Sequence, residues 1–261
     1  MHSVDGFMDW FPKDLALPGI AGAGLFAMSW LFAGLSVIGQ PHIMVRFMTL
    51  EDSGKMRRAR MWYYGWFTVF YLLATAVGML SRIHLSDPGS FDAELALPTM
   101  AEQLLPGFGA GVILAGIFAA TMSTADSLIL SCSSAVTHDL LPHKIENTLL
   151  IKAGTVLITL VALLWALLNS QSVFQLVILA WSGLASAFAP LLIALCLGLR
   201  PSRATCILAM ILGLSVALVW RYLGWHGVVY EGMPGILVGI AVIGVSLLIR
   251  TKETHFPEPS N

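Results

Sequence analysis

The stretch GIFAATMSTADS fills residues 116 to 127 and lies inside an apolar run from about residue 109 to residue 134. A run of this length is typical of a membrane-spanning helix. On a helical wheel, small and hydroxyl-bearing residues share one stripe: Gly116, Ala120, Ser123, Thr124, Ser127, Ser131 and Ser134. Such a stripe suits close packing against other helices, and it equally suits a site where a cation takes oxygen ligands. Periodicity alone leaves both interpretations open.

The composition of the chain indicates a membrane protein. It has 261 residues, of which 57% are hydrophobic and 11% charged, and its mean hydropathy is +0.81. Soluble domains have roughly 25% charged residues, and the sequence repeatedly shows uncharged runs of about 18 or more residues. The net charge of −1 gives no basic surface for nucleic acid. No phosphate-binding Gly-rich loop, HExxH or GxSxG is present, so we expect no enzyme. The predicted fold class is an all-α polytopic membrane protein.

Hydropathy divides the chain into seven predicted spans. They lie at about 19–48, 62–80, 109–134, 149–168, 173–199, 204–222 and 235–249. We expect residues 1–18 to form an external loop or interfacial segment, residues 19–250 a single seven-span domain, and residues 251–261 a polar tail. Within the polar loop 81–108, residues 98–106 predict a short amphipathic helix, and residues 138–144 are predicted to form a loop.

The distribution of basic residues predicts the orientation of these spans. Eleven of the fourteen Lys and Arg residues fall on one set of flanks: Arg46, Lys55, Arg57, Arg58, Arg60, Lys144, Lys152, Arg200, Arg203, Arg250 and Lys252. The other set holds Lys13, Arg82 and Arg221. Because basic flanks stay on the cytoplasmic side, we expect the N-terminus outside and the C-terminus in the cytoplasm, in a cell (inner or plasma) membrane.

The first span is interrupted by Gly39-Gln40-Pro41-His42. Pro41 cannot donate a backbone hydrogen bond and disfavours helix at Gln40, which predicts a discontinuous helix. Transporters hold substrates and ions at such breaks, whereas a simple proline kink is satisfied by neighbouring groups. Gln40 and His42 either line a pathway or brace the break, and Arg46 is predicted to anchor the cytoplasmic end.

Three separated motifs resemble the sodium/solute symporter family, and its sodium/proline branch in particular. Gly39-Gln40-Pro41-His42 with residues 45–48 is similar to the sixth core helix of that family. Residues 119–127, AATMSTADS, with residues 132–140 resemble the eighth core helix, and residues 180–190, AWSGLASAFAP, resemble the tenth. Their order along the chain is the same as in the family.

The resemblance implies a fold and an activity. The family has two inverted five-helix repeats followed by extra helices, so residues 19–199 would be the second repeat and residues 204–249 the extra helices. It implies sodium-driven uptake of a small solute by alternating access, with Na⁺ as the coupling ion, in contact with membrane lipid. A membrane sensor or interaction module derived from a symporter fold is the alternative.

The resemblance also implies a sodium site between the first and eighth core helices. Its ligands here would be the backbone carbonyl of Ala120 and the hydroxyls of Ser123 and Thr124. The partner carbonyls of the first core helix have no counterpart in this chain. Half of a coordination shell cannot offset the dehydration of an ion at membrane depth. We therefore expect the chain to need an N-terminal half and to be inactive alone. Hydroxyls bonded back to their own helix are the structural alternative.

The family's substrate site points to the segment before Pro41. Proline-transporting relatives tend to carry aromatic residues one and two turns before this proline, where this chain has Val37 and Ala33, with Trp30 one turn further back. The resemblance leaves proline, a related small amino acid or an organic acid as the candidate solutes. The predicted pathway residues are Val37, Gln40, Pro41, Asp126 and Ser127. Asp126 is either functional or paired structurally, and Trp181 and Ser182 either face a cavity or pack.

Overall fold

The computed structural model describes residues 9, 11–12, 15, 17–49, 52–85, 92–140, 148–168 and 172–253. The regular elements in these ranges are helices, and seven spans among them are long and apolar enough to cross a membrane. The predicted all-α polytopic membrane fold is therefore confirmed. The helices form two compact units. Unit 1 comprises residues 1–8 and 48–170, and unit 2 comprises residues 9–47 and 171–261.

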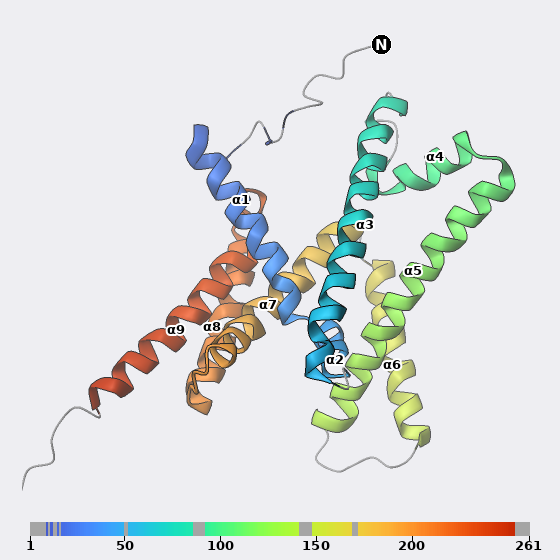
Figure 1. The fold of residues 1–261 in the computed structure, drawn as a ribbon. Helices are drawn as coiled ribbons and strands as arrows, with labels where there is room; N and C mark the ends of the chain where they lie inside the picture. The colour runs from blue at the N-terminus through green and yellow to red at the C-terminus, as the bar shows by residue number, and fades with distance from the viewer. Residues whose placement is uncertain are drawn as a thin grey trace, which may run out of the picture. The chain divides into compact units, whose positions relative to one another are not determined.

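Unit 1 holds the helices of the middle of the chain. They are α3 (Met56–His84), α4 (Ala96–Leu104), α5 (Gly107–Ser134) and α6 (Thr148–Leu168). The short helix α4 lies between α3 and α5 and contacts both, and α5 contacts α6 (Figure 1). The predicted amphipathic helix over residues 98–106 is thus confirmed as α4, two residues earlier.

The ends of two helices in unit 1 differ from the prediction. Helix α3 extends beyond the predicted 62–80 at both ends, because hydropathy locates the membrane-spanning part and the basic residues before it are good helix formers. Helix α5 continues as a π-helical turn over Ala135–Leu140, so the predicted loop is wrong for residues 138–140. This turn is supported by Thr137, which is buried and whose hydroxyl donates to the Ser133 carbonyl at 2.7 Å. Residues 141–147 lie outside the described residues.

Unit 2 holds the interrupted first span and the last three helices. Its elements are α1 (Gly19–Leu35), a 3₁₀ turn η1 (Ser36–Gly39), α2 (Pro41–Met48), α7 (Val173–Cys196), α8 (Arg203–Tyr222) and α9 (Gly232–Glu253). Helices α7, α8 and α9 pack against one another, and α1 and η1 pack against α7. Most of the predicted segment 1–18, and the tail after residue 253, lie outside the described residues.

Glycines let the backbones of unit 2 approach closely. A Cβ atom on Gly213 of α8 would collide with the Ser186 carbonyl oxygen, and one on Gly235 of α9 with the Ser186 hydroxyl. A Cβ on Gly239 would lie 2.5 Å from Pro190 Cγ. The facing stripe of α7 is made of small residues that are fully buried, including Ala185 and Ser186. Close approach through small residues is how membrane helices gain van der Waals packing.

Candidate functional site

The break in the first span forms as the sequence predicts. Helix α1 ends at Leu35 and tightens into the 3₁₀ turn η1, after which Gln40 is extended, with φ −93° and ψ 108°. Helix α2 then begins at Pro41, whose missing N–H and fixed φ suit the first turn of a helix. The Gln40 carbonyl accepts from the amides of Ile43 and Met44 at 3.1 and 3.0 Å, which starts the new helix.

Gln40 braces this break from inside unit 2. Its side chain is 1% exposed, and its Nε2 donates to the Ser36 carbonyl at 3.4 Å. Gly39 lies so close to α7 that a Cβ there would be 2.5 Å from Ala185 Cα. Of the other predicted pathway residues near the break, Val37 is half-buried and Pro41 exposed. The backbone at the break is thus held by side-chain packing in addition to helical hydrogen bonds.

The predicted sodium ligands lie together on α5 of unit 1. Ala120, Ser123 and Thr124 are all exposed, and the Thr124 hydroxyl donates to the Ala120 carbonyl at 3.2 Å. Two oxygens at this separation can both lie about 2.4 Å from one hard cation. Of the remaining candidates on α5, Asp126 is exposed and Ser127 half-buried, with the Ser127 hydroxyl donating to the Ser123 carbonyl at 2.9 Å.

The contact between α5 and α6 uses a different part of α5. Ser133 is buried, and its hydroxyl lies 2.7 Å from that of Thr155 on α6. Ser133 is absent from the stripe defined by Gly116, Ala120 and Ser123, because it lies about 100° round the helix from Gly116, on the side away from Thr124. The contact with α6 therefore leaves the exposed residues Gly116, Ala120, Ser123 and Thr124 open to a further ligand or partner.

A buried polar segment in unit 2 was not predicted from the sequence. Tyr230 is 7% exposed, its amide donates to Ser29 Oγ at 2.7 Å, and its hydroxyl lies 2.9 Å from Ser36 Oγ. Burial raises the pKa of Tyr230 to about 12, because a low-dielectric surrounding disfavours the phenolate. The Tyr230 hydroxyl is therefore protonated at neutral pH and available as a donor.

The next residue, Glu231, continues this segment toward two other helices. Its carboxylate is buried and accepts from Arg221 Nη1 of α8 at 2.7 Å and from Ser182 Oγ of α7 at 3.2 Å. Ser182 is 1% exposed, so it packs within unit 2, as the packing alternative expects. The sequence signal that could have revealed the segment is an acidic residue ten positions after an arginine across a short loop.

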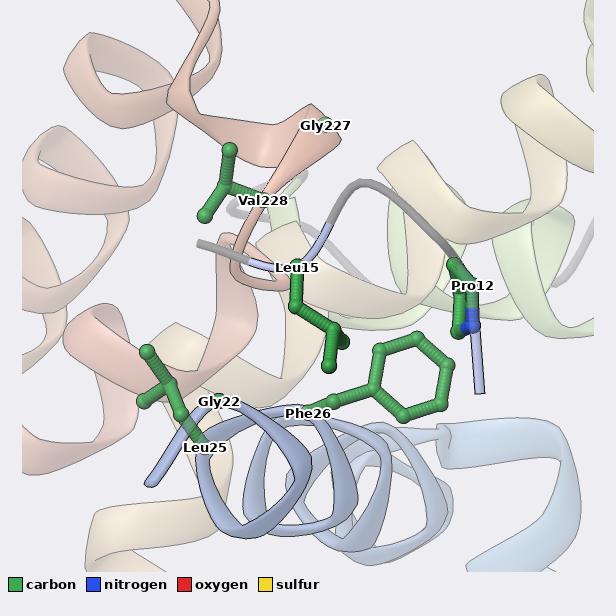
Figure 2. Close-up of a pocket in the computed structure, with 7 residues that line it drawn as sticks. All are labelled: Pro12, Leu15, Gly22, Leu25, Phe26, Gly227 and Val228. Carbon is green, nitrogen blue, oxygen red and sulfur yellow. The ribbon is translucent and has the colours of Figure 1, made fainter. Parts of the chain in front are cut away.

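Two cavities of unit 2 lie near this segment. The larger, of about 190 Å³, is lined by Phe26, Ser29, Trp30, Phe174, Gln175, Ile178, Arg221, His226, Gly227, Val228, Tyr230 and Glu231. The smaller, of about 60 Å³, is lined by apolar side chains and glycines. Figure 2 shows Pro12, Leu15 and Phe26 gathered at this smaller cavity. Only the larger one combines aromatic walls with charged groups.

Comparison with known proteins places the chain in a family. The family model described as the sodium:solute symporter family matches residues 21–213, a range that includes both the helix break and the polar stripe of α5. The chain belongs to the sodium:solute symporter family. Members of this family are transporters and not enzymes, and the seven apolar helices agree with a multi-pass membrane protein.

The chain is similar to curated sodium/proline symporters. It is 33% identical to the one from Escherichia coli (strain K12) over 235 residues, which cover 85% of this chain and 46% of that relative. It is 32% identical to the one from Salmonella typhimurium over 245 residues, covering 88% and 48%. It is 29% identical to the one from Staphylococcus aureus (strain NCTC 8325 / PS 47) over 273 residues, which cover 95% of this chain and 52% of that relative. The chain thus spans about half the length of these relatives. No solved structure gives a significant match.

Proposed function

We propose that this chain is the C-terminal half of a sodium-coupled symporter for a small solute. In this proposal residues 19–199 form the second inverted repeat, residues 204–249 are the extra helices, and residues 1–18 and 251–261 flank the domain. The N-terminus is outside and the C-terminus in the cytoplasm. The observation that carries the proposal is the helix break at Gln40, which lies within the matched range 21–213 of the family. Broken membrane helices supply free backbone groups for binding solutes and ions.

The sodium ion is proposed to bind at Ala120, Ser123 and Thr124. The 3.2 Å separation of Thr124 Oγ1 and the Ala120 carbonyl oxygen supports this role, because both atoms can coordinate one cation after a rotation of the hydroxyl hydrogen. The exposure of all three residues means that further ligands have to come from another helix. We propose that the N-terminal half supplies them, and that the chain alone is inactive.

The solute is proposed to be proline or a related small amino acid. The names of the three relatives support this class, since each is a sodium/proline symporter. The proposed pathway residues are Val37, Gln40 and Pro41 at the break and Asp126 and Ser127 on α5. Val37 stands where proline-transporting relatives tend to carry an aromatic residue. The solute pocket here would therefore be wider, and it would lack that ring as a stacking surface for the solute.

The test joins this chain to the N-terminal half of the Escherichia coli relative and measures proline uptake in proteoliposomes. We expect sodium-dependent uptake by the chimera and none by the chain alone. Ser123→Ala and Thr124→Ala are each expected to raise the sodium concentration for half-maximal uptake about tenfold or more, as loss of a charge-assisted ligand does.

The matched control is Thr121→Ala. Thr121 is an exposed hydroxyl on the same helix and bonds back to the Phe118 carbonyl at 2.9 Å, but it lies outside the stripe. It is expected to leave the sodium dependence unchanged. Sodium dependence that is unaltered in both Ser123→Ala and Thr124→Ala would rule out the proposed site, and uptake by the chain alone would rule out the need for a second half.

A further inference from the structure

The two consecutive residues Tyr230 and Glu231 connect most of unit 2. Tyr230 bonds to Ser29 on α1 and to Ser36 in η1, while Glu231 bonds to Ser182 on α7 and Arg221 on α8. The donor and acceptor side chains of this segment are buried except for Arg221, whose side chain is 16% exposed. Immediately after Glu231 the chain enters α9 at Gly232. One short segment therefore ties the last helix pair to the interrupted first span.

The two hydrogen bonds at Ser36 have a defined direction. The Ser36 hydroxyl donates to the Phe32 carbonyl at 2.9 Å, so its single proton is used there. The bond of 2.9 Å between Ser36 Oγ and Tyr230 Oη must then be donated by Tyr230. The raised pKa of Tyr230 keeps that proton in place over the physiological range. Ser36 is fully buried, so no water replaces the bond when it is lost.

Ser36 is also the residue on which the helix break rests. Its carbonyl accepts the Gln40 side-chain amide at 3.4 Å, and Gln40 is the extended residue between η1 and α2. The Gln40 backbone is bonded along the chain, its amide to the Val37 carbonyl at 3.1 Å and its carbonyl to the amides of Ile43 and Met44. The Gln40 side chain is held by Ser36, and the contact of Gly39 with Ala185 places the turn against α7. The Tyr230 hydroxyl is thus two hydrogen-bonded steps away from Gln40.

We propose that Tyr230 is a positioning residue for the helix break. Its hydroxyl holds Ser36, and through Ser36 the Gln40 side chain, in the arrangement that binds solute. Glu231 keeps Tyr230 in register by anchoring the same segment to α7 and α8. The helix pair α8 and α9 therefore acts on the solute site from outside it. This inference rests on the proposed function only in placing the solute at the break.

The first test uses the chain itself and needs no transport. Cys132, Cys196 and Cys206 are replaced by serine, Val37→Cys is introduced beside the break, and its modification by a small methanethiosulfonate reagent is timed in detergent. Val37 is half-buried, so its reaction rate reports how well the turn is held. We expect Tyr230→Phe to raise the rate about fivefold, the factor that one buried hydrogen bond supplies.

Two further variants make this test specific. Ser36→Ala removes the acceptor, so it should reproduce the effect, and the double variant should be no faster than Ser36→Ala alone, because both changes remove the same bond. Tyr222→Phe, at a tyrosine that is 90% exposed at the end of α8, is the matched control and should leave the rate unchanged. An unchanged rate in both Tyr230→Phe and Ser36→Ala would overturn the proposal.

The second test measures uptake kinetics in the chimera described above. Tyr230→Phe is expected to raise the KM for solute about fivefold while the maximal rate, corrected for protein amount, stays within a factor of two. A residue that only stabilises the fold would instead lower the amount of active protein at constant KM, and that result would overturn the positioning role. If the chimera does not transport at all, the proposed function fails while the thiol-modification result still decides the role of Tyr230.

Discussion

Helices α5 and α7 carry similar stripes of small and hydroxyl-bearing residues, yet the structure uses them differently. Along α7 the stripe is buried: Ser182, Ala185, Ser186, Ala187, Ala189, Pro190 and Ala194. Glycines of the neighbouring helices α8 and α9 face it, and Ser182 bonds across to Glu231. Along α5 the buried residues are Ala110 and Ser133, outside the stripe, and the hydroxyl of Thr124 bonds back to its own helix.

This difference separates two meanings of the same sequence pattern. A small-residue stripe that meets glycines on other helices is a packing surface. The close backbone contact that it allows stabilises helix association in lipid through van der Waals packing. A stripe whose hydroxyls bond back to their own helix keeps those oxygens available, since a back-bonded hydroxyl can exchange its partner at little cost. On α5 the hydroxyls of Thr124, Ser127 and Ser131 donate to carbonyls of their own helix, which agrees with the proposed role of this stripe as half of an ion site.

The largest effect on unit 2 is expected from Glu231→Gln. The substitution keeps the shape of the side chain but leaves Arg221, whose side chain is 16% exposed, without its counter-charge. We expect a loss of about 3 kcal/mol in the free energy of unfolding, at the low end for breaking a buried pair. The measurement is denaturant unfolding in detergent micelles. Glu102→Gln, at an exposed position of α4, is the control, and equal effects of the two variants would contradict a structural role for the pair.

The next largest effect is expected from Gly235→Ala. The new Cβ would collide with the Ser186 side chain and lie 2.8 Å from the Gly213 carbonyl oxygen, so α7, α8 and α9 would have to separate. Overpacking of this kind costs about 2 kcal/mol. Gly244→Ala on the same helix meets nothing within 4 Å and should be neutral or slightly stabilising. Adding Ser186→Gly should recover part of the loss, and no recovery would mean that the contact with Ser186 is not its source.

The sequence predicts the spans and the break well, for physical reasons that also define its limits. Hydropathy reports which residues prefer lipid, so helix centres are found but the basic start of α3 is not. The break follows from local chemistry at Gly39-Gln40-Pro41. The bond between Ser36 and Tyr230 joins residues 194 positions apart. A tyrosine in a loop belongs to no periodic pattern, so the sequence does not predict its hydrogen-bond partner. For Ala120, Ser123 and Thr124, periodicity predicts that they share one face of a helix. Their role as sodium ligands remains a prediction from the family resemblance.

A smaller effect is expected from alkaline pH. The pKa of Tyr230 is about 12 in the folded protein against about 10 for an unfolded chain, so between these values the folded state binds more protons. Stability is then fully present below pH 10 and falls as the pH rises toward 12, by about 1 kcal/mol at pH 11. The check is the difference in unfolding free energy between the chain and Tyr230→Phe, which should lack this loss. Tyr222→Phe should retain it, and an identical pH dependence of all three proteins would contradict the assignment.

The smallest effect on stability, and the sharpest test of the comparison, is expected from Gly116→Ala on α5. Gly116 belongs to the exposed stripe, and a Cβ there meets nothing within 4 Å. The unfolding free energy of the chain should therefore stay the same or rise by up to about 1 kcal/mol from improved helix propensity. In the chimera, where the N-terminal half is proposed to cover this stripe, the same methyl group should lower sodium-dependent uptake because it separates the two halves. A destabilisation of the chain alone as large as that of Gly235→Ala would show that the α5 stripe is already a packing surface, and the contrast between the two helices would be lost.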